Sequence, residues 1–86
     1  MKYLSENTVS ELKILGFEGD KEGMEISFEE ECEHIEIGYV NDDDSEEYGT
    51  LQSYQYGTVD GLTNEFDNEK ELVKHMKFLV ECYSEE

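Results

Sequence analysis

The chain contains no arginine, alanine, proline or tryptophan, and its strongly basic side chains are six lysines. Against these stand 24 aspartates and glutamates, which give a formal net charge of −18 with neutral histidines. From Glu22 through Asn68 the sequence holds no lysine at all. Because nucleic-acid binding depends on Lys and Arg that neutralise phosphates, this composition argues against direct binding to DNA or RNA.

The sequence also lacks long apolar runs. No segment approaches the ~20 apolar residues of a membrane-spanning helix, and the first residues lack the apolar core of a secretory signal peptide. We therefore expect a cytoplasmic protein with no membrane partner. Its two cysteines, Cys32 and Cys82, are then expected to be reduced thiols rather than a disulfide.

Acidity of this degree is also found in disordered chains, but here the apolar residues fall into regular patterns. Six Tyr, four Phe and a set of Ile, Leu, Val and Met are spread along the 86 residues. This length suits one acidic domain over residues 1–86. The 36% apolar content supports one small core but not a deep active-site cleft as well.

Two segments have the spacing of helices. In the first, Thr8 and Glu11 have the spacing of a capping box, and Gly16 suits the position just after a helix end. The apolar residues between them recur every three positions, which predicts a helix over 8–15, or over 6–15 with fraying.

The second helix is predicted within 67–83, with Asp67 or Asn68 as its cap. Its apolar residues form one stripe at helical spacing. They are Leu72, Val73, Met76, Leu79, Val80 and Tyr83.

Alternation of apolar and polar residues predicts strands between these helices. The segments are GMEISFE (23–29), EHIEIGYV (33–40), YGTLQSYQYGTV (48–59) and, as a short fourth strand, LTNEF (62–66). The order predicts an α+β domain: a small antiparallel sheet of three to four strands, with an N-terminal and a C-terminal helix packed on one face. The other face of the sheet is then left open to water.

The third of these strands carries a row of tyrosines. If Leu51 faces the core, Tyr48, Tyr54 and Tyr56 face outward, because side chains alternate along a strand. A bulge would reverse part of this pattern and bury some of the tyrosines. The sequence leaves both arrangements open.

Calcium binding by the acidic segment after residue 40 does not fit the EF-hand pattern. A loop starting at Asp42 places Glu47 where glycine belongs. A loop starting at Asp44 places Gly49 correctly, but it places Gln55 where a bidentate glutamate is needed. We expect no metal and no cofactor.

Zinc binding and catalysis find equally little support. Cys32, His34, His75 and Cys82 supply ligand types, but His75 and Cys82 would lie about 10 Å apart along one helix at ~1.5 Å per residue. There is no glycine-rich phosphate loop, no GxSxG and no HExxH. We therefore expect a protein that is not an enzyme.

The acidic residues gather in two turns, residues 29–33 and 41–47, that flank the strand carrying Glu36. At ~3.3 Å per residue these turns would lie on the order of 23 Å apart, with Glu36 between them. Outward tyrosines would add aromatic anchors of the kind found at interface hot spots. The predicted partner-binding residues are Glu25, Glu29, Glu30, Glu31, Glu33, Glu36, Asp42, Asp43, Asp44, Glu46, Glu47, Tyr48, Tyr54 and Tyr56.

In size, acidity and architecture the chain resembles the phage-encoded DNA-mimic inhibitors, with EEECE and NDDDSEE as its local features. That class includes inhibitors of uracil-DNA glycosylase, restriction enzymes, CRISPR effectors and histone-like nucleoid proteins of the HU type. The resemblance implies a monomer or homodimer in the host cytoplasm that occupies the DNA-binding surface of a basic host protein. A nucleoid protein of the HU type is the preferred target.

Other functions share this physics. An immunity protein or antitoxin that neutralises a basic toxin would have a similar surface, as would an anti-restriction or anti-CRISPR inhibitor. An acidic domain of a larger assembly is the remaining alternative. Sequence alone separates these classes poorly, because all of them place carboxylates opposite a basic partner.

Overall fold

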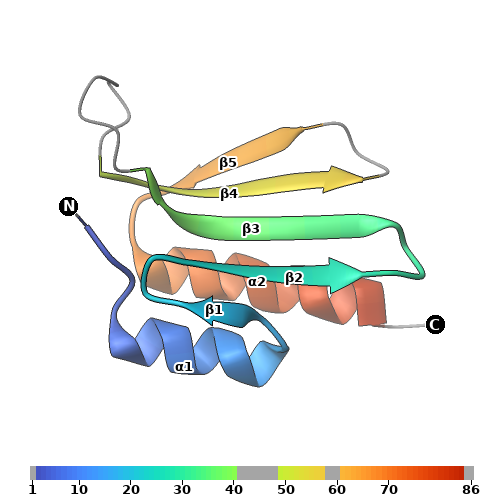
Figure 1. The fold of residues 1–86 in the computed structure, drawn as a ribbon, viewed down its shortest axis with the longest axis horizontal. Helices are drawn as coiled ribbons and strands as arrows, with labels where there is room; N and C mark the ends of the chain where they lie inside the picture. The colour runs from blue at the N-terminus through green and yellow to red at the C-terminus, as the bar shows by residue number, and fades with distance from the viewer. Residues whose placement is uncertain (1, 41–48, 58–60, 85–86) are drawn as a thin grey trace.

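The computed structural model describes residues 2–40, 49–57 and 61–84, and it has an α+β architecture of one antiparallel sheet and two helices (Figure 1). In chain order the elements are α1 (Glu6–Leu15), β1 (Glu18–Asp20), β2 (Gly23–Phe28), β3 (Glu33–Val40), β4 (Thr50–Gly57), β5 (Leu62–Phe66) and α2 (Glu69–Ser84). The predicted fold class is confirmed, with five strands in place of three to four.

The sheet is a meander with the strand order β1-β2-β3-β4-β5, so every strand pairs with its neighbour in the chain (Figure 1). The strand that the sequence did not predict is β1, three exposed residues on the edge of the sheet. Gly19 permits its pairing, because a Cβ there would lie 2.3 Å from the carbonyl oxygen of Gly23.

Both helices cover the same face of the sheet, and the core lies between the two layers. Buried apolar side chains from three strands meet the buried side chains of α1 and α2 there. The fully or almost fully buried members are Leu4, Leu12, Phe17, Met24, Ile35, Ile37, Leu51, Leu72 and Met76. Burial of these side chains is the main stabilising contribution available to a chain of this size.

The first helix spans Glu6–Leu15, the longer of its two predicted ranges, but Thr8 of the predicted capping box is not its N-cap. Ser5 is the N-cap, and its Oγ accepts a hydrogen bond from the backbone N–H of Thr8 at 3.3 Å. Thr8 lies inside α1 and is buried, so it does not act as the cap. Gly16 ends the helix as predicted, with a left-handed φ of 109°.

The second helix follows its prediction closely. The side chain of Asn68, just before α2, accepts a hydrogen bond from the backbone N–H of Glu71 at 2.9 Å, which satisfies one of the free donors of the helix start. Neither helix in the described parts of the chain has the length and apolar character that a membrane crossing needs.

The carboxylate of Glu69 connects α2 to α1 and to the sheet. Its Oε1 accepts hydrogen bonds from the backbone N–H of Ser5 at 2.9 Å and from the Ser5 hydroxyl at 3.0 Å. Its Oε2 accepts one from the hydroxyl of Tyr39, on β3, at 2.9 Å. The Glu69 carboxylate therefore links α2 to the start of α1 and to β3, which lie far apart in sequence.

Candidate functional site

The face of the sheet opposite the helices carries polar and aromatic side chains, and we refer to it as the open face. Its residues alternate along each strand with the buried ones, because successive side chains of a strand point to opposite sides. They include Glu18, Glu25, Ser27, His34, Glu36, Gln52, Tyr54, Tyr56, Thr63 and Glu65.

A row of three glutamates crosses the first three strands of the open face. Glu18 pairs with Glu25, and Glu25 pairs with Glu36 on the next strand. The row continues to Tyr54 on β4. Like charges placed directly opposite each other destabilise a sheet, so this row lowers the stability of the fold and adds negative potential to the open face.

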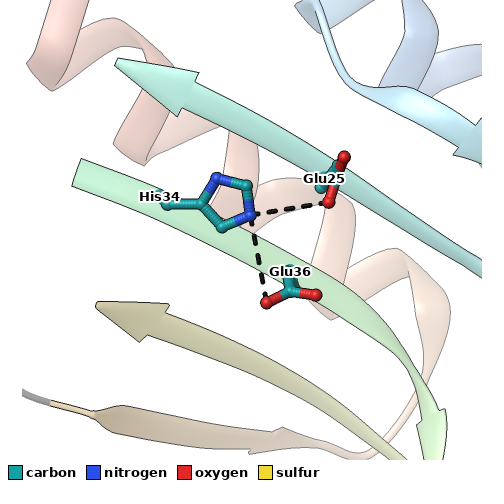
Figure 2. Close-up of side chains that lie close together, drawn as sticks. All are labelled: Glu25, His34 and Glu36. Atoms are coloured by element: carbon teal, nitrogen blue, oxygen red, sulfur yellow. Dashed lines mark ion pairs between the residues drawn. The ribbon is translucent and has the colours of Figure 1, made fainter. Parts of the chain in front are cut away.

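The next row runs from Ser27 through His34 to Tyr56. The hydroxyl of Ser27 lies 2.6 Å from Nδ1 of His34. The other ring nitrogen, Nε2, lies 3.5 Å from Oε2 of Glu25 and 3.9 Å from Oε2 of Glu36 (Figure 2). Among the open-face residues His34 alone is basic, and its ring faces both central carboxylates.

Tyr54 and Tyr56 face outward and Leu51 packs in the core, so the structure has the first of the two arrangements that the sequence left open. Tyr54 is 44% exposed and Tyr56 is 38% exposed. Their ring centroids lie 5.3 Å apart, and the ring of Tyr56 lies 4.9 Å from that of His34. The three rings form a continuous aromatic strip beside the glutamate row.

The hydroxyl of Tyr56 is coupled to the glutamate row. Its pKa is raised by loss of hydration, then by the charge of Glu36 and by a hydrogen bond to that carboxylate, with smaller effects of Glu25 and Tyr54. A phenol is protonated at neutral pH even at its ordinary pKa of about 10, so the Tyr56 hydroxyl donates to the Glu36 carboxylate.

Two shallow hollows lie on either side of Glu36. One, of about 340 Å³, is lined on the open face by Glu18, Glu25 and Glu36. The other, of about 820 Å³, is lined by Glu36, the two tyrosines and two glycines that follow them. Both hollows are open to solvent, a shape that fits an extended surface of a partner better than an enclosed small molecule.

The turn between β2 and β3 is exposed and acidic, as predicted. Glu29, Glu30 and Glu31 lie there with exposed side chains. Glu33 does not belong to this surface, which corrects the prediction. It is 6% exposed, faces the helices, and accepts a hydrogen bond from Nε2 of Gln55 at 3.3 Å. The reason is strand alternation, which places residue 33 on the same side as Ile35.

The second predicted acidic turn lies outside the described residues. This applies to Asp42, Asp43, Asp44, Glu46, Glu47 and Tyr48. The two cysteines, which were expected to be reduced thiols rather than a disulfide, are both free and exposed. His34 lies on the sheet, and His75 lies on α2 against the ring of Phe66 at 5.5 Å.

Three ionisable members of the open face are absent from the predicted partner-binding residues: Glu18, His34 and Glu65. His34 has the same alternation as Glu36, so the strand pattern already placed it beside the predicted acids. On β5, Glu65 lies two residues after Thr63, so alternation places both side chains on the same side of the sheet. Glu18 could not be placed, because the strand that carries it was not predicted.

Comparison with known proteins gives no relative: no protein-family model, curated protein or solved structure matches the chain. The function of the open face is therefore inferred from its own chemistry. That chemistry combines four glutamates, two half-exposed phenols and one imidazole, and the residues of this face include no lysine.

Proposed function

We propose that the protein is a DNA-mimic inhibitor that binds the DNA-binding surface of a basic host protein and blocks DNA binding, with a nucleoid protein of the HU type as the preferred target. The observation that carries this proposal is the row Glu18–Glu25–Glu36 beside two exposed tyrosines, on a sheet face that no described helix or strand covers. Carboxylates arranged on a rigid surface offer a basic partner the same sign of charge as a phosphate backbone.

The spacing of the row indicates what electrostatics contributes. Neighbouring strands lie about 4.7–4.9 Å apart, so the three carboxylates span roughly 9.5 Å. A duplex carries about five to six charges over that length, at one per ~1.7 Å. The row alone has about half that density, which favours steering of a basic partner over holding it tightly.

The aromatic strip is expected to provide the contacts that slow dissociation of the complex. Tyrosine is enriched among the residues that dominate interface energies, because it buries a large rigid area and keeps a hydroxyl for hydrogen bonding. Tyr54 and Tyr56 lie beside the row with a large part of each ring still accessible. A partner seated on the open face would cover both rings together with Glu36.

The test is a competition between this protein and labelled duplex DNA for a purified HU-type protein, followed by fluorescence anisotropy at low and moderate salt. We expect the DNA to be released, and association to slow steeply as ionic strength rises. DNA that stays bound at a large excess of this protein would exclude the HU-type target. Binding of this protein to the DNA itself would refute the whole proposal.

A matched pair of variants separates a specific surface from general acidity. Glu25→Gln with Glu36→Gln removes two charges from the open face, and Glu11→Gln with Glu81→Gln removes two from exposed positions on the helices. We expect the first pair to slow association several-fold and the second pair to leave it unchanged. Equal effects would indicate that net charge alone attracts the partner.

Substitution of the tyrosines tests whether the aromatic strip slows dissociation of the complex. Tyr54→Ala or Tyr56→Ala should raise the dissociation rate by roughly 30-fold, as expected for loss of about 2 kcal/mol at a hot spot. Thermal melts of both variants serve as the control, because half-exposed side chains contribute less to folding than core residues. Variants that melt and bind normally would exclude the aromatic strip from the interface.

A further inference from the structure

The geometry points to a binding site for a divalent transition-metal ion of the zinc type, formed by Glu25, His34 and Glu36 on the open face (Figure 2). One nitrogen and two carboxylate oxygens converge there, and these ligand atoms all lie within 4.8 Å of one another. This site needs no partner protein, because all three ligands belong to this chain, but it shares Glu25 and Glu36 with the glutamate row of the proposed inhibitor surface.

The distances lie close to those of a metal site. A tetrahedral zinc ion with bonds of ~2.0–2.1 Å holds its ligand atoms about 3.3–3.4 Å apart. The Nε2 atom of His34 lies 3.5 Å from Glu25 Oε2 and 3.9 Å from Glu36 Oε2. The side chains of the two glutamates are 56% and 52% exposed, so small rotations can close the remaining gap.

The histidine is held in an orientation suited to metal binding. Its Nδ1 lies 2.6 Å from the hydroxyl of Ser27, which can accept the ring proton. In that tautomer the lone pair is on Nε2, the atom that faces the two carboxylates. Histidine ligands of metals commonly donate their other N–H in this way, which fixes the ring and raises the basicity of the ligand nitrogen.

The pairing of β2 and β3 alone brings the three ligand side chains together, without a metal ion. Glu25 and Glu36 are directly paired across β2 and β3, and His34 lies two residues before Glu36 on the same side of β3. Two carboxylates held opposite each other repel, so a cation between them relieves a cost already present in the fold. Paired strands also hold ligands more rigidly than a loop does.

The ligand set indicates the class of metal. Calcium and magnesium prefer sites made of oxygen alone, whereas imidazole suits zinc, copper and nickel. Three protein ligands leave one tetrahedral position for a solvent molecule, because the side chains of both glutamates are more than half exposed. Zinc is the suitable probe, since it imposes little geometric preference of its own.

The experiment is a Zn²⁺ titration in millimolar Mg²⁺, followed by NMR of the histidine ring nitrogens and by calorimetry. The protein carries Cys32→Ser and Cys82→Ser, because exposed thiols would bind zinc themselves. The chain has two histidines, so His75 serves as an internal control. We expect the His34 signals to change up to one equivalent of zinc while those of His75 stay in place.

Variants of single ligands complete the test. His34→Gln and Glu36→Gln should each weaken zinc binding at least tenfold, and Ser27→Ala should weaken it less because Ser27 only positions the ring. Glu65→Gln removes one charge from the same face and should leave the affinity for zinc unchanged. All four positions are on the open face rather than in the core, and thermal melts check that each variant is folded.

Three results would overturn the proposal. The first is zinc binding of unchanged affinity in both His34→Gln and Glu36→Gln. The second is a parallel change in the signals of His34 and His75. The third is loss of zinc binding in millimolar Mg²⁺, which would indicate only loose condensation of cations on an acidic surface.

Discussion

Glu69 receives hydrogen bonds from α1 and β3, so its replacement measures how strongly this carboxylate stabilises the contact between the two layers. We consider Glu69→Gln and Tyr39→Phe, singly and together. Hydrogen bonds to a charged group contribute about 1.5–3 kcal/mol, against about 0.5–1.5 for neutral pairs. Because Glu69 is only partly buried, we expect each single change to cost about 1–2 kcal/mol of unfolding free energy, with a coupling of ~1 kcal/mol between them.

The coupling should depend on pH in a defined direction. Partial burial alone raises the pKa of Glu69, but hydrogen bonds from Ser5, Thr8 and Tyr39 outweigh it and leave the pKa lowered. A group whose pKa is lowered by folding stabilises the folded state fully above its unfolded pKa, which is about 4.3 for glutamate. This contribution is then lost as pH falls through the lower, folded value.

The assay is urea unfolding of the four proteins at neutral pH and near pH 3, at constant salt, followed by circular dichroism. Differences between variants at one pH cancel the general repulsion of the acidic surface. The coupling should be about 1 kcal/mol at neutral pH and clearly smaller in acid. A coupling that is absent at neutral pH, or identical at both pH values, would refute the assignment of this carboxylate as a charged acceptor.

Three further changes test the fold. Met76→Ala removes a fully buried side chain and should lower the free energy of unfolding in urea by about 2–5 kcal/mol. Its control is Phe78→Ser, at a 59% exposed position of the same helix, which should lower the free energy of unfolding by about 0.5 kcal/mol or less. Gly57→Ala should lower thermal stability by at least about 1–3 kcal/mol, because φ there is 131° and the new Cβ would lie 1.9 Å from the carbonyl oxygen of Cys32. Burial, then the hydrogen bond and charge of Glu69, raise the pKa of Tyr39 to about 12. The stabilisation that this phenol provides is complete below about pH 10 and is lost as pH rises through the folded value. In an ultraviolet titration, Tyr39→Phe should remove a phenol that ionises near pH 12.

Alternation and helical spacing were sufficient to predict most of the architecture. Ile35 and Ile37 point to the core and Glu36 to the open face, as period-two spacing requires. The position of Leu51 likewise predicted that the tyrosines of β4 face outward, provided that no bulge intervened. These predictions hold because each of these strands has one buried side, which fixes its register strongly.

Other features depended on contacts that local patterns do not contain. The three residues of β1 include no apolar side chain, and they form a strand only because β2 offers an unpaired edge. Ser5 and Thr8 are both residue types that can cap a helix, and tertiary packing decides between them by burying Thr8. Glu33 was assigned to the turn because charge usually marks exposure, but Gln55 offers it a partner inside.

The candidate site shows the same division. That Glu25, Glu36 and Tyr54 share a face follows from alternation. These three residues form one row only because of the register in which the strands pair, and the length of each connecting turn sets that register. The approach of His34 to both carboxylates also depends on this register, so one sequence with its strand pattern could not predict it.

The meander has a consequence for the order in which the chain folds. Every strand pairing joins neighbours in the chain, so each hairpin closes a short loop at low entropic cost. The contact between Ser5 and Glu69 instead spans 64 residues. Its closure entropy is recovered only after both helices have docked. We therefore expect the hairpins to dominate the folding transition state, and loss of the Ser5–Glu69 contact to accelerate unfolding while leaving the folding rate almost unchanged.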